Sequence, residues 1–231
     1  HAVFEIMGYP SGLPRNTLQC LEDYRIPLFL RHTVTDIHGS SRLTGVTVSQ
    51  VDENRCPIPG TEQEYPCDTL ILSAGLIPEN NLAIDCGIAI DPQTNGAAVD
   101  ECFQTSVPGV FAAGNVLHVH DLVDFVSTEA EQLADGAATY VLGQELASCG
   151  LAVKAGEGVS QVVPQKVSGK RDFTLSMRVR KPGGRCVIEV MQNGNSVAKK
   201  AMPKVLPAEM IQFHVKAENM EQTGDLEVTI Q

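Results

Sequence analysis

The chain has 231 residues, of which 43% are hydrophobic and 19% charged. These proportions are typical of a folded globular protein and exclude an intrinsically disordered one. The net charge of −11 argues against nucleic-acid binding, and no apolar run reaches the roughly 18 residues of a membrane span. Seven cysteines, an odd number without a C-x-x-C pair, favour a reducing cytoplasm.

The charge is unevenly distributed along the chain. Residues 1–150 carry 5 basic and 20 acidic side chains, whereas residues 151–231 carry 12 basic and 8 acidic ones. Such a change predicts a domain boundary near residue 150. The basic part has two interpretations, an ordinary solvated surface or a surface that docks on the acidic region or on a partner.

The first 75 residues carry alternating strand and helix signals. Residues 2–6 predict an apolar strand ending at an acid, and Asn16 is placed to cap a helix that runs to about Tyr24. A strand over residues 26–30 follows. Residues 33–74 predict a meander whose turns lie at 39–41 and 57–60, and whose last strand, residues 68–75, is buried and ends at glycine.

The next segment repeats the pattern of a strand that ends at glycine. Residues 110–113 predict a short apolar strand ending at Gly114. A helix is expected over residues 128–142, because Thr128 and Glu131 have the spacing of a capping box and glycine at 143 is a natural stop.

Beyond residue 150 the apolar period becomes two. Apolar and polar residues alternate over residues 173–180, 211–216 and 226–230. Hairpin turns are predicted at residues 181–184 and 193–194. Several short strands with one apolar face predict a small β-sandwich with almost no helix.

Two segments of the first half resemble motifs of the pyridine nucleotide-disulfide oxidoreductase family. Residues 68–80 (DTLILSAGLIPEN) resemble the strand and crossover that leave its nicotinamide domain. Residues 105–115 (TSVPGVFAAGN) resemble its second flavin motif, in which a threonine and a short strand precede Gly-Asp. The order and spacing of these motifs match over roughly residues 1–145.

The resemblance implies an α/β fold, a partial Rossmann-like flavoprotein with two dinucleotide-binding domains, followed by the all-β sandwich. Residues 1–78 would be the latter half of an NAD(P)-binding domain and residues 79–150 the C-terminal part of an FAD-binding domain. Residues 151–231 would form the sandwich. Both glycine loops of such an enzyme are expected upstream of residue 1.

The resemblance also implies a function. In the family, NAD(P)H delivers hydride to FAD, and the flavin passes electrons to a second acceptor. Glu5 favours NADH, because a carboxylate would repel the 2′-phosphate of NADPH. We expect the chain alone to be inactive and colourless. A partner redox protein or subunit, or a homo-oligomer, fits this interpretation, and the alternative is a non-catalytic interaction module that retains a relic nucleotide fold.

Six residues are expected to contact the cofactors. They are Glu5, Gly75, Gly114, Asn115, Val126 and Ser127. Asn115 stands where the family has an acid, so its oxygen would accept a ribityl hydrogen bond without the charge. Val126 and Ser127 are expected at the N-terminus of the helix, where backbone N–H groups and the helix dipole favour negative charge.

His118 and His120 are the candidate catalytic residues. One of them could relay a proton, or both could be satisfied residues of a polar loop. With Asp121 and Asp124 they could also ligate a metal, although no cysteine or glutamate lies nearby in the sequence to complete a set. We therefore expect no metal.

Overall fold

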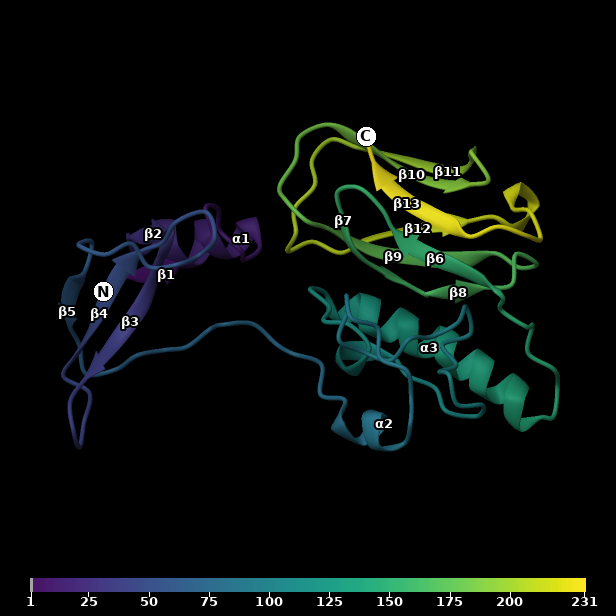
Figure 1. Ribbon diagram of the computed structural model, residues 1–231, viewed down its shortest axis with the longest axis horizontal. Helices are drawn as coiled ribbons and strands as arrows, with labels where there is room; N and C mark the ends of the chain where they lie inside the picture. Colours follow the sequence, from purple (N-terminus) through teal and green to yellow (C-terminus); the bar gives the residue numbers. More distant parts are fainter. Residues whose placement is uncertain (1) are drawn as a thin grey trace. The chain divides into compact units, whose positions relative to one another are not determined.

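The computed structural model describes residues 2–231, which divide into two compact units, His1–Gly75 and Leu76–Gln231. Figure 1 shows the elements of each unit along the chain. Within the described residues, no helix is both long and apolar enough to cross a bilayer.

The first unit contains two small sheets and one short helix. Its elements are β1 (Val3–Glu5), α1 (Pro14–Asn16), the π-helical turn η1 (Thr17–Glu22), β2 (Leu28–Leu30), β3 (His32–His38), β4 (Gly45–Gln50) and β5 (Gln63–Pro66). β1 and β2 pair in parallel. β3, β4 and β5 form an antiparallel meander, as predicted, but its third strand lies at Gln63–Pro66 and not at residues 68–75. Val46 and Val48 of β4 are buried, as the alternating pattern requires.

The helix of the first unit begins earlier than predicted. Leu13 precedes it without a side-chain cap, and Pro14 is its first residue. Proline suits this position because its fixed φ is already helical and its missing N–H has no helical partner to lose. Asn16 lies inside the helix, so the prediction that it caps the helix was wrong.

The predicted buried strand over residues 68–75 is not formed. Residues 69–80 belong to no element, and nowhere in residues 2–231 does an N–H group of residues 69–79 find a backbone partner. Ile71 and Leu72 are 85% and 79% exposed. An apolar segment becomes a strand only beside another strand, and the described chain offers none to this one.

The second unit begins with a region that has little regular structure. Its elements are α2 (Asn81–Asp85), the 3₁₀ turn η2 (Gly114–Val116) and α3 (Val123–Val141). The predicted strand over residues 110–113 is reduced to one antiparallel bridge between Gln104 and Phe111. A small core holds the region together, formed by Ala97, Val99, Phe103, Leu117 and Val163.

Helix α3 starts five residues before its predicted beginning. Its N-cap is Leu122, again without a side-chain cap. The hydroxyl of Thr128 donates to the carbonyl of Asp124 within the helix at 3.0 Å, so the predicted capping box was wrong. The predicted stop is confirmed, because Gly143 has a φ of +69° directly after the helix.

The C-terminal part of the second unit is the predicted β-sandwich. Its strands are β6 (Leu151–Ala155), β7 (Val159–Val163), β8 (Lys166–Val167), β9 (Phe173–Val179), β10 (Cys186–Gln192), β11 (Asn195–Met202), β12 (Ile211–Val215) and β13 (Leu226–Ile230). One sheet has the order β11-β10-β13-β6-β8 and the other β12-β9-β7. The core contains side chains from both sheets, among them Leu175, Ile188, Val190 and Leu226. The 3₁₀ turn η3 (Ala217–Asn219) is the helical element of this part.

One of the two predicted hairpin turns is confirmed. Asn193 and Gly194 join the paired strands β10 and β11, with φ of +51° and +82°. Two consecutive positive φ values are typical of a type I′ turn. Residues 181–184 connect β9 to β10, which belong to different sheets, so the prediction of a hairpin there was wrong. A turn signal marks a reversal but does not say which strands pair.

Within the second unit, the sandwich and the preceding region are joined by polar contacts. The backbone of Val99 exchanges hydrogen bonds with Gln165, one to its side chain at 2.9 Å and one from its N–H at 3.0 Å. The buried carboxylate of Glu101 accepts from both the N–H and the hydroxyl of Ser168. These contacts fix the region that carries α3 against the sandwich.

Candidate functional site

The turn at Gly114 is held against helix α3. Gly114 has a φ of +74°, a conformation that favours glycine. A β-carbon placed there would lie 3.7 Å from the side chain of Val126. The N–H of Gly114 donates to Oε1 of Glu129 at 2.6 Å. The turn and the helix therefore share one buried carboxylate.

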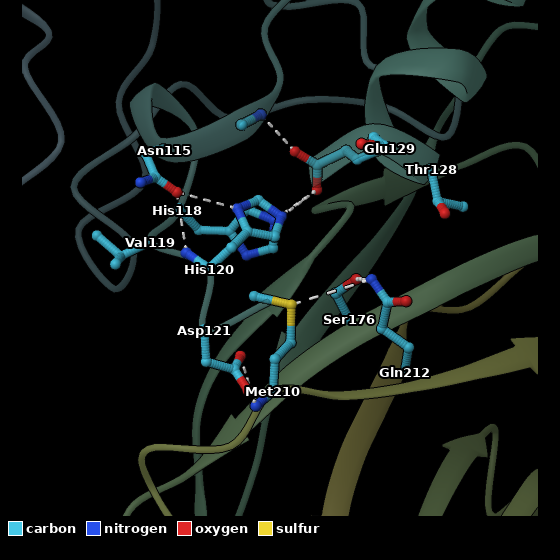
Figure 2. A network of polar contacts seen from close by, with 12 residues as sticks. Asn115, His118, Val119, His120, Asp121, Thr128, Glu129, Ser176, Met210 and Gln212 are labelled. Carbon is cyan, nitrogen blue, oxygen red and sulfur yellow. Dashed lines mark hydrogen bonds and ion pairs between the residues drawn. The ribbon is translucent and has the colours of Figure 1, made fainter. Parts of the chain in front are cut away.

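Glu129 also binds both histidines of the preceding loop (Figure 2). Its Oε2 lies 2.6 Å from Nε2 of His118 and 3.3 Å from Nε2 of His120. The side chains of all three residues are at most 3% exposed. Figure 2 shows the two imidazole rings lying together between Asn115 and Glu129.

The carboxyl group of Glu129 is strongly acidic. Burial by itself raises its pKa, but hydrogen bonds from His118 and His120, the charge of His118 and the N–H of Gly114 outweigh that effect. Together they lower the pKa of Glu129 to about 2. The cluster therefore contains a carboxylate that stays ionised although it is out of water.

Asn115 orients His120 with its amide oxygen. Its Oδ1 accepts from the backbone N–H of His120 at 3.0 Å and lies 3.3 Å from Nδ1 of the same ring. Because a backbone N–H can only donate, this contact settles which amide atom is the oxygen. The amide NH₂ is then the part of Asn115 left to meet a ligand, so it offers a donor where the sequence predicted an acceptor.

His120 lies between two oxygens. Its Nε2 faces Oε2 of Glu129 and its Nδ1 faces Oδ1 of Asn115. Both partners accept hydrogen bonds, so the two contacts are made together only when both ring nitrogens carry hydrogen. The arrangement is suited to holding a proton next to a carboxylate.

His118, His120 and Glu129 together are also a candidate metal site. The sequence showed no glutamate close to the two histidines, but the structure brings Glu129 to them. One ligand atom from each of His118, His120 and Glu129 lies within 4.8 Å of the others. Two ligand atoms on one tetrahedral zinc lie roughly 3.3 Å apart, whereas His118 and Glu129 are separated by 2.6 Å, a hydrogen-bond distance. The geometry therefore favours a shared proton over a metal. Asp121 and Asp124, proposed as ligands from the sequence, are not in the cluster.

An open hollow adjoins Asn115. It is lined by Leu76, Ile77, Glu79, Asn115 and Val116. Leu76 and Ile77 are exposed, so the hollow offers apolar surface beside the side-chain amide of Asn115.

The start of α3 changes the expectation for Val126 and Ser127. Because the helix begins at Val123, both residues lie in its second turn and not at its N-terminus. The N–H groups without helical partners belong to the first turn instead. Val126 still packs beside Gly114, and its role in binding a cofactor, like that of Ser127, stays a prediction.

Glu5 and Gly75 lie in the first unit. Glu5 ends strand β1 as predicted, but its carboxylate accepts from the N–H of Met7 at 2.8 Å and from the side chain of Ser11. It therefore ties down the loop that follows β1. Gly75 has a φ of +91° and open space around it. For both residues, contact with a nucleotide stays a prediction.

Sequence reasoning missed Glu129. Its signal is the helical spacing that it shares with Phe125, Leu133 and Gly136, which form the less exposed side of α3. An acid on the apolar stripe of an amphipathic helix is expected to have a buried partner. The identity of that partner could not be found from spacing, because His118 lies in a loop.

Comparisons with known proteins place this region in a family. The family model described as pyridine nucleotide-disulphide oxidoreductase matches residues 16–139. A probable ferredoxin reductase of Castellaniella defragrans is 31% identical over 97 residues, which cover 39% of this chain and 23% of that protein. A ferredoxin–NADP reductase of Paracidovorax citrulli is 34% identical over 116 residues, which cover 46% of this chain and 29% of that protein.

The chain thus spans about a quarter of the length of these curated relatives. A solved thioredoxin reductase from Gloeobacter violaceus matches 59% of this chain and 42% of its own at 18% identity, with a TM-score of 0.29.

Proposed function

Because the chain belongs to the pyridine nucleotide-disulphide oxidoreductase family, we propose that it is part of a flavoprotein oxidoreductase that takes hydride from NADH and passes electrons to a further acceptor. The observation that carries the proposal is the turn at Gly114 and Asn115, which is held on helix α3 by the buried carboxylate of Glu129. This turn falls where the resemblance expects the flavin.

The residues around this turn fit FAD. Gly114 has no side chain to obstruct a close approach, and the free NH₂ of Asn115 can donate to a ribityl hydroxyl. The first turn of α3 offers backbone N–H groups and the positive end of a 19-residue helix. The flavin, when bound, accepts hydride and releases electrons; the chain supplies the cradle.

The histidine cluster supplies the proton chemistry in this proposal. Glu129 orients the rings of His118 and His120, and Asn115 places a hydrogen on Nδ1 of His120. A positioned imidazole is a suitable relay for a proton between solvent and a reduced cofactor.

The nucleotide preference is a separate part of the proposal. Glu5 at the end of β1 favours NADH, whereas the printed name of the relative from Paracidovorax citrulli specifies NADP. That name also specifies ferredoxin, so a small redox protein is the class of acceptor that we propose. Rates with NADH and NADPH, compared in the protein that carries this chain, separate the two preferences.

Flavin retention in variants at Asn115 tests the proposed site. Asn115→Leu removes the donor and should lower the flavin content after dialysis, because a lost hydrogen bond to a ligand costs about 0.5–1.5 kcal/mol or more. Asn115→Asp keeps an acceptor for the N–H of His120, and its second oxygen can accept from the ribityl hydroxyl in place of the lost donor, so flavin should stay bound. The readout is the ratio of flavin to protein absorbance in the protein that carries this chain.

A matched control is Asn81→Leu, at an exposed asparagine on α2 outside the site. It should retain flavin fully. An Asn115→Leu protein with its complete yellow colour would remove Asn115 from the site. A colourless unmutated protein would favour the alternative, a non-catalytic interaction module.

A further inference from the structure

The β-sandwich reaches the histidine loop through one largely buried arginine. Arg178 lies on β9, and 13% of its side chain is exposed. Its Nη2 donates to the carbonyl of Val119 and to Oδ1 of Asp121, both at 3.0 Å. Its Nη1 donates to the carbonyl of Pro207 at 2.9 Å. One planar guanidinium thus joins the sandwich to the loop that precedes α3.

Asp121 is held by the sandwich from a second direction. Its Oδ1 also accepts from the N–H of Met210 at 3.1 Å, and its side chain is only 10% exposed. Figure 2 shows Asp121 pointing to Met210, while His118 and His120 point to Asn115 and Glu129. The histidines and their anchors therefore alternate along one short segment and face opposite ways.

The anchors leave the loop little freedom. Val119, whose carbonyl Arg178 binds, lies between the two histidines, and Asp121 follows the second. A shift of this backbone would carry both imidazoles away from Glu129. Burial of the guanidinium lowers the pKa of Arg178, and the charge of Asp121 counteracts it. The two charges therefore compensate each other. Removal of either partner would leave the charge of the other largely buried and unpaired.

We propose that Arg178 is a positioning residue that sets the geometry of His118 and His120, and that the β-sandwich serves as an internal brace for the redox site. Arg178 lies outside residues 16–139, the part that the family model matches, so this brace is an addition to the shared region. The proposal rests on the proposed function for its meaning in catalysis, but the brace can be measured without flavin.

Histidine-selective NMR of the 231-residue chain tests the brace. Nitrogen-15 shifts report which ring nitrogens carry hydrogen, and exchange with water reports how often the contact between His118 and Glu129 opens. Arg178→Met should change the ring signals of His118 and His120 and accelerate exchange of the His118 ring hydrogen at least about tenfold, since contacts to a charged group are lost. The ring signals of His32, His38 and His214 should not change.

Two further variants keep the test decisive if Arg178→Met fails to fold. Arg178→Lys retains the charge but not the planar fork, and should give an intermediate effect on the same signals. Asp121→Asn retains the shape of the anchor and should act in the same direction. The matched control is Arg171→Met, which removes another arginine that joins the two parts, through Sγ of Cys102 at 3.2 Å, but does not touch the loop.

The proposal is overturned if the Arg178 and Asp121 variants lower stability while the ring signals and exchange of His118 and His120 stay as in the unmutated chain. Arg178 would then be an ordinary structural contact. If the protein that carries this chain is colourless but the variants alter the histidine signals, the proposed function fails and the brace stands.

Discussion

Glu129 has a carboxylate in a position where charge is costly. Its side chain is 3% exposed, and three hydrogen bonds from Gly114, His118 and His120 replace the water that it has lost. Those bonds favour the ionised form, because a protonated carboxyl group gives one acceptor position to its own O–H and accepts the others more weakly. The turn, the histidine loop and the helix therefore depend on one charge.

This dependence predicts a loss of stability in acid. The pKa of Glu129 in the folded protein, about 2, lies below its usual value of 4.5. A lowered pKa means that the stabilisation is fully present above pH 4.5 and is lost as the pH falls towards 2. The shift corresponds to about 3 kcal/mol. Glu129→Gln should thus destabilise the protein at pH 7, and its difference from the unmutated chain should fall by about half at pH 3.

Urea denaturation between pH 3 and 7 measures this difference. Glu131→Gln is the matched control, because Glu131 is an exposed acid on the same helix. Its difference from the unmutated chain should be small at every pH. A difference for Glu129→Gln that stays constant from pH 7 to pH 3 would show that Glu129 is not ionised in the cluster.

Helix α3 is positioned by close backbone contact. A β-carbon at Gly136 would lie 2.6 Å from the carbonyl oxygen of Cys102 and 3.1 Å from its side chain. Glycine at this position brings the helix near the segment that precedes residues 105–115. The contact lies two helical turns beyond Glu129 and keeps the same side of the helix turned inward.

Gly136→Ala tests the packing of helix α3 against Cys102. Alanine favours helix over glycine by about 1 kcal/mol, but here the added methyl group must push the helix from Cys102. Overpacking of this kind costs about 1–3 kcal/mol, so the variant should be less stable by urea denaturation.

Gly150→Ala is the control, because a β-carbon there meets nothing within 4 Å. It should change the free energy of unfolding by less than about 0.5 kcal/mol. Stabilisation by Gly136→Ala would show that α3 does not pack against Cys102.

At the scale of the whole molecule, the segment around the boundary of the two units exposes large apolar side chains. Ile71, Leu72, Leu76 and Ile77 are between 69% and 85% exposed. Exposed backbone without hydrogen-bond partners is a preferred site of proteolysis, and thermolysin cuts beside large apolar side chains. The sandwich, by contrast, has its apolar side chains buried between two paired sheets.

Thermolysin should therefore cut first within residues 69–77 and leave a product that begins near residue 72 to 77 and ends at 231. Mass spectrometry identifies the cut, and circular dichroism shows whether the product keeps its sheets. A Leu72→Asp, Leu76→Asp double variant should be cut more slowly at this segment. Early cutting within residues 151–231 would contradict the division into units.

The sequence by itself determined the features that depend on local pattern. The first two strands of the meander, the sandwich strands β9, β12 and β13, the turn at Asn193 and Gly194 and the end of α3 were predicted, because period-two alternation and glycine at positive φ act over a few residues. The family followed from two motifs with fixed order and spacing. Each of these signals is contained in neighbouring residues.

Tertiary structure alone decided what depends on partners distant in sequence. Residues 68–75 have the composition of a buried strand but no neighbouring strand in the described chain, so they stay exposed. Glu129 meets His118 across 11 positions, and Arg178 meets Asp121 across 57. A carboxylate or guanidinium gains its role from the groups that replace its water, and no local pattern specifies which groups those are.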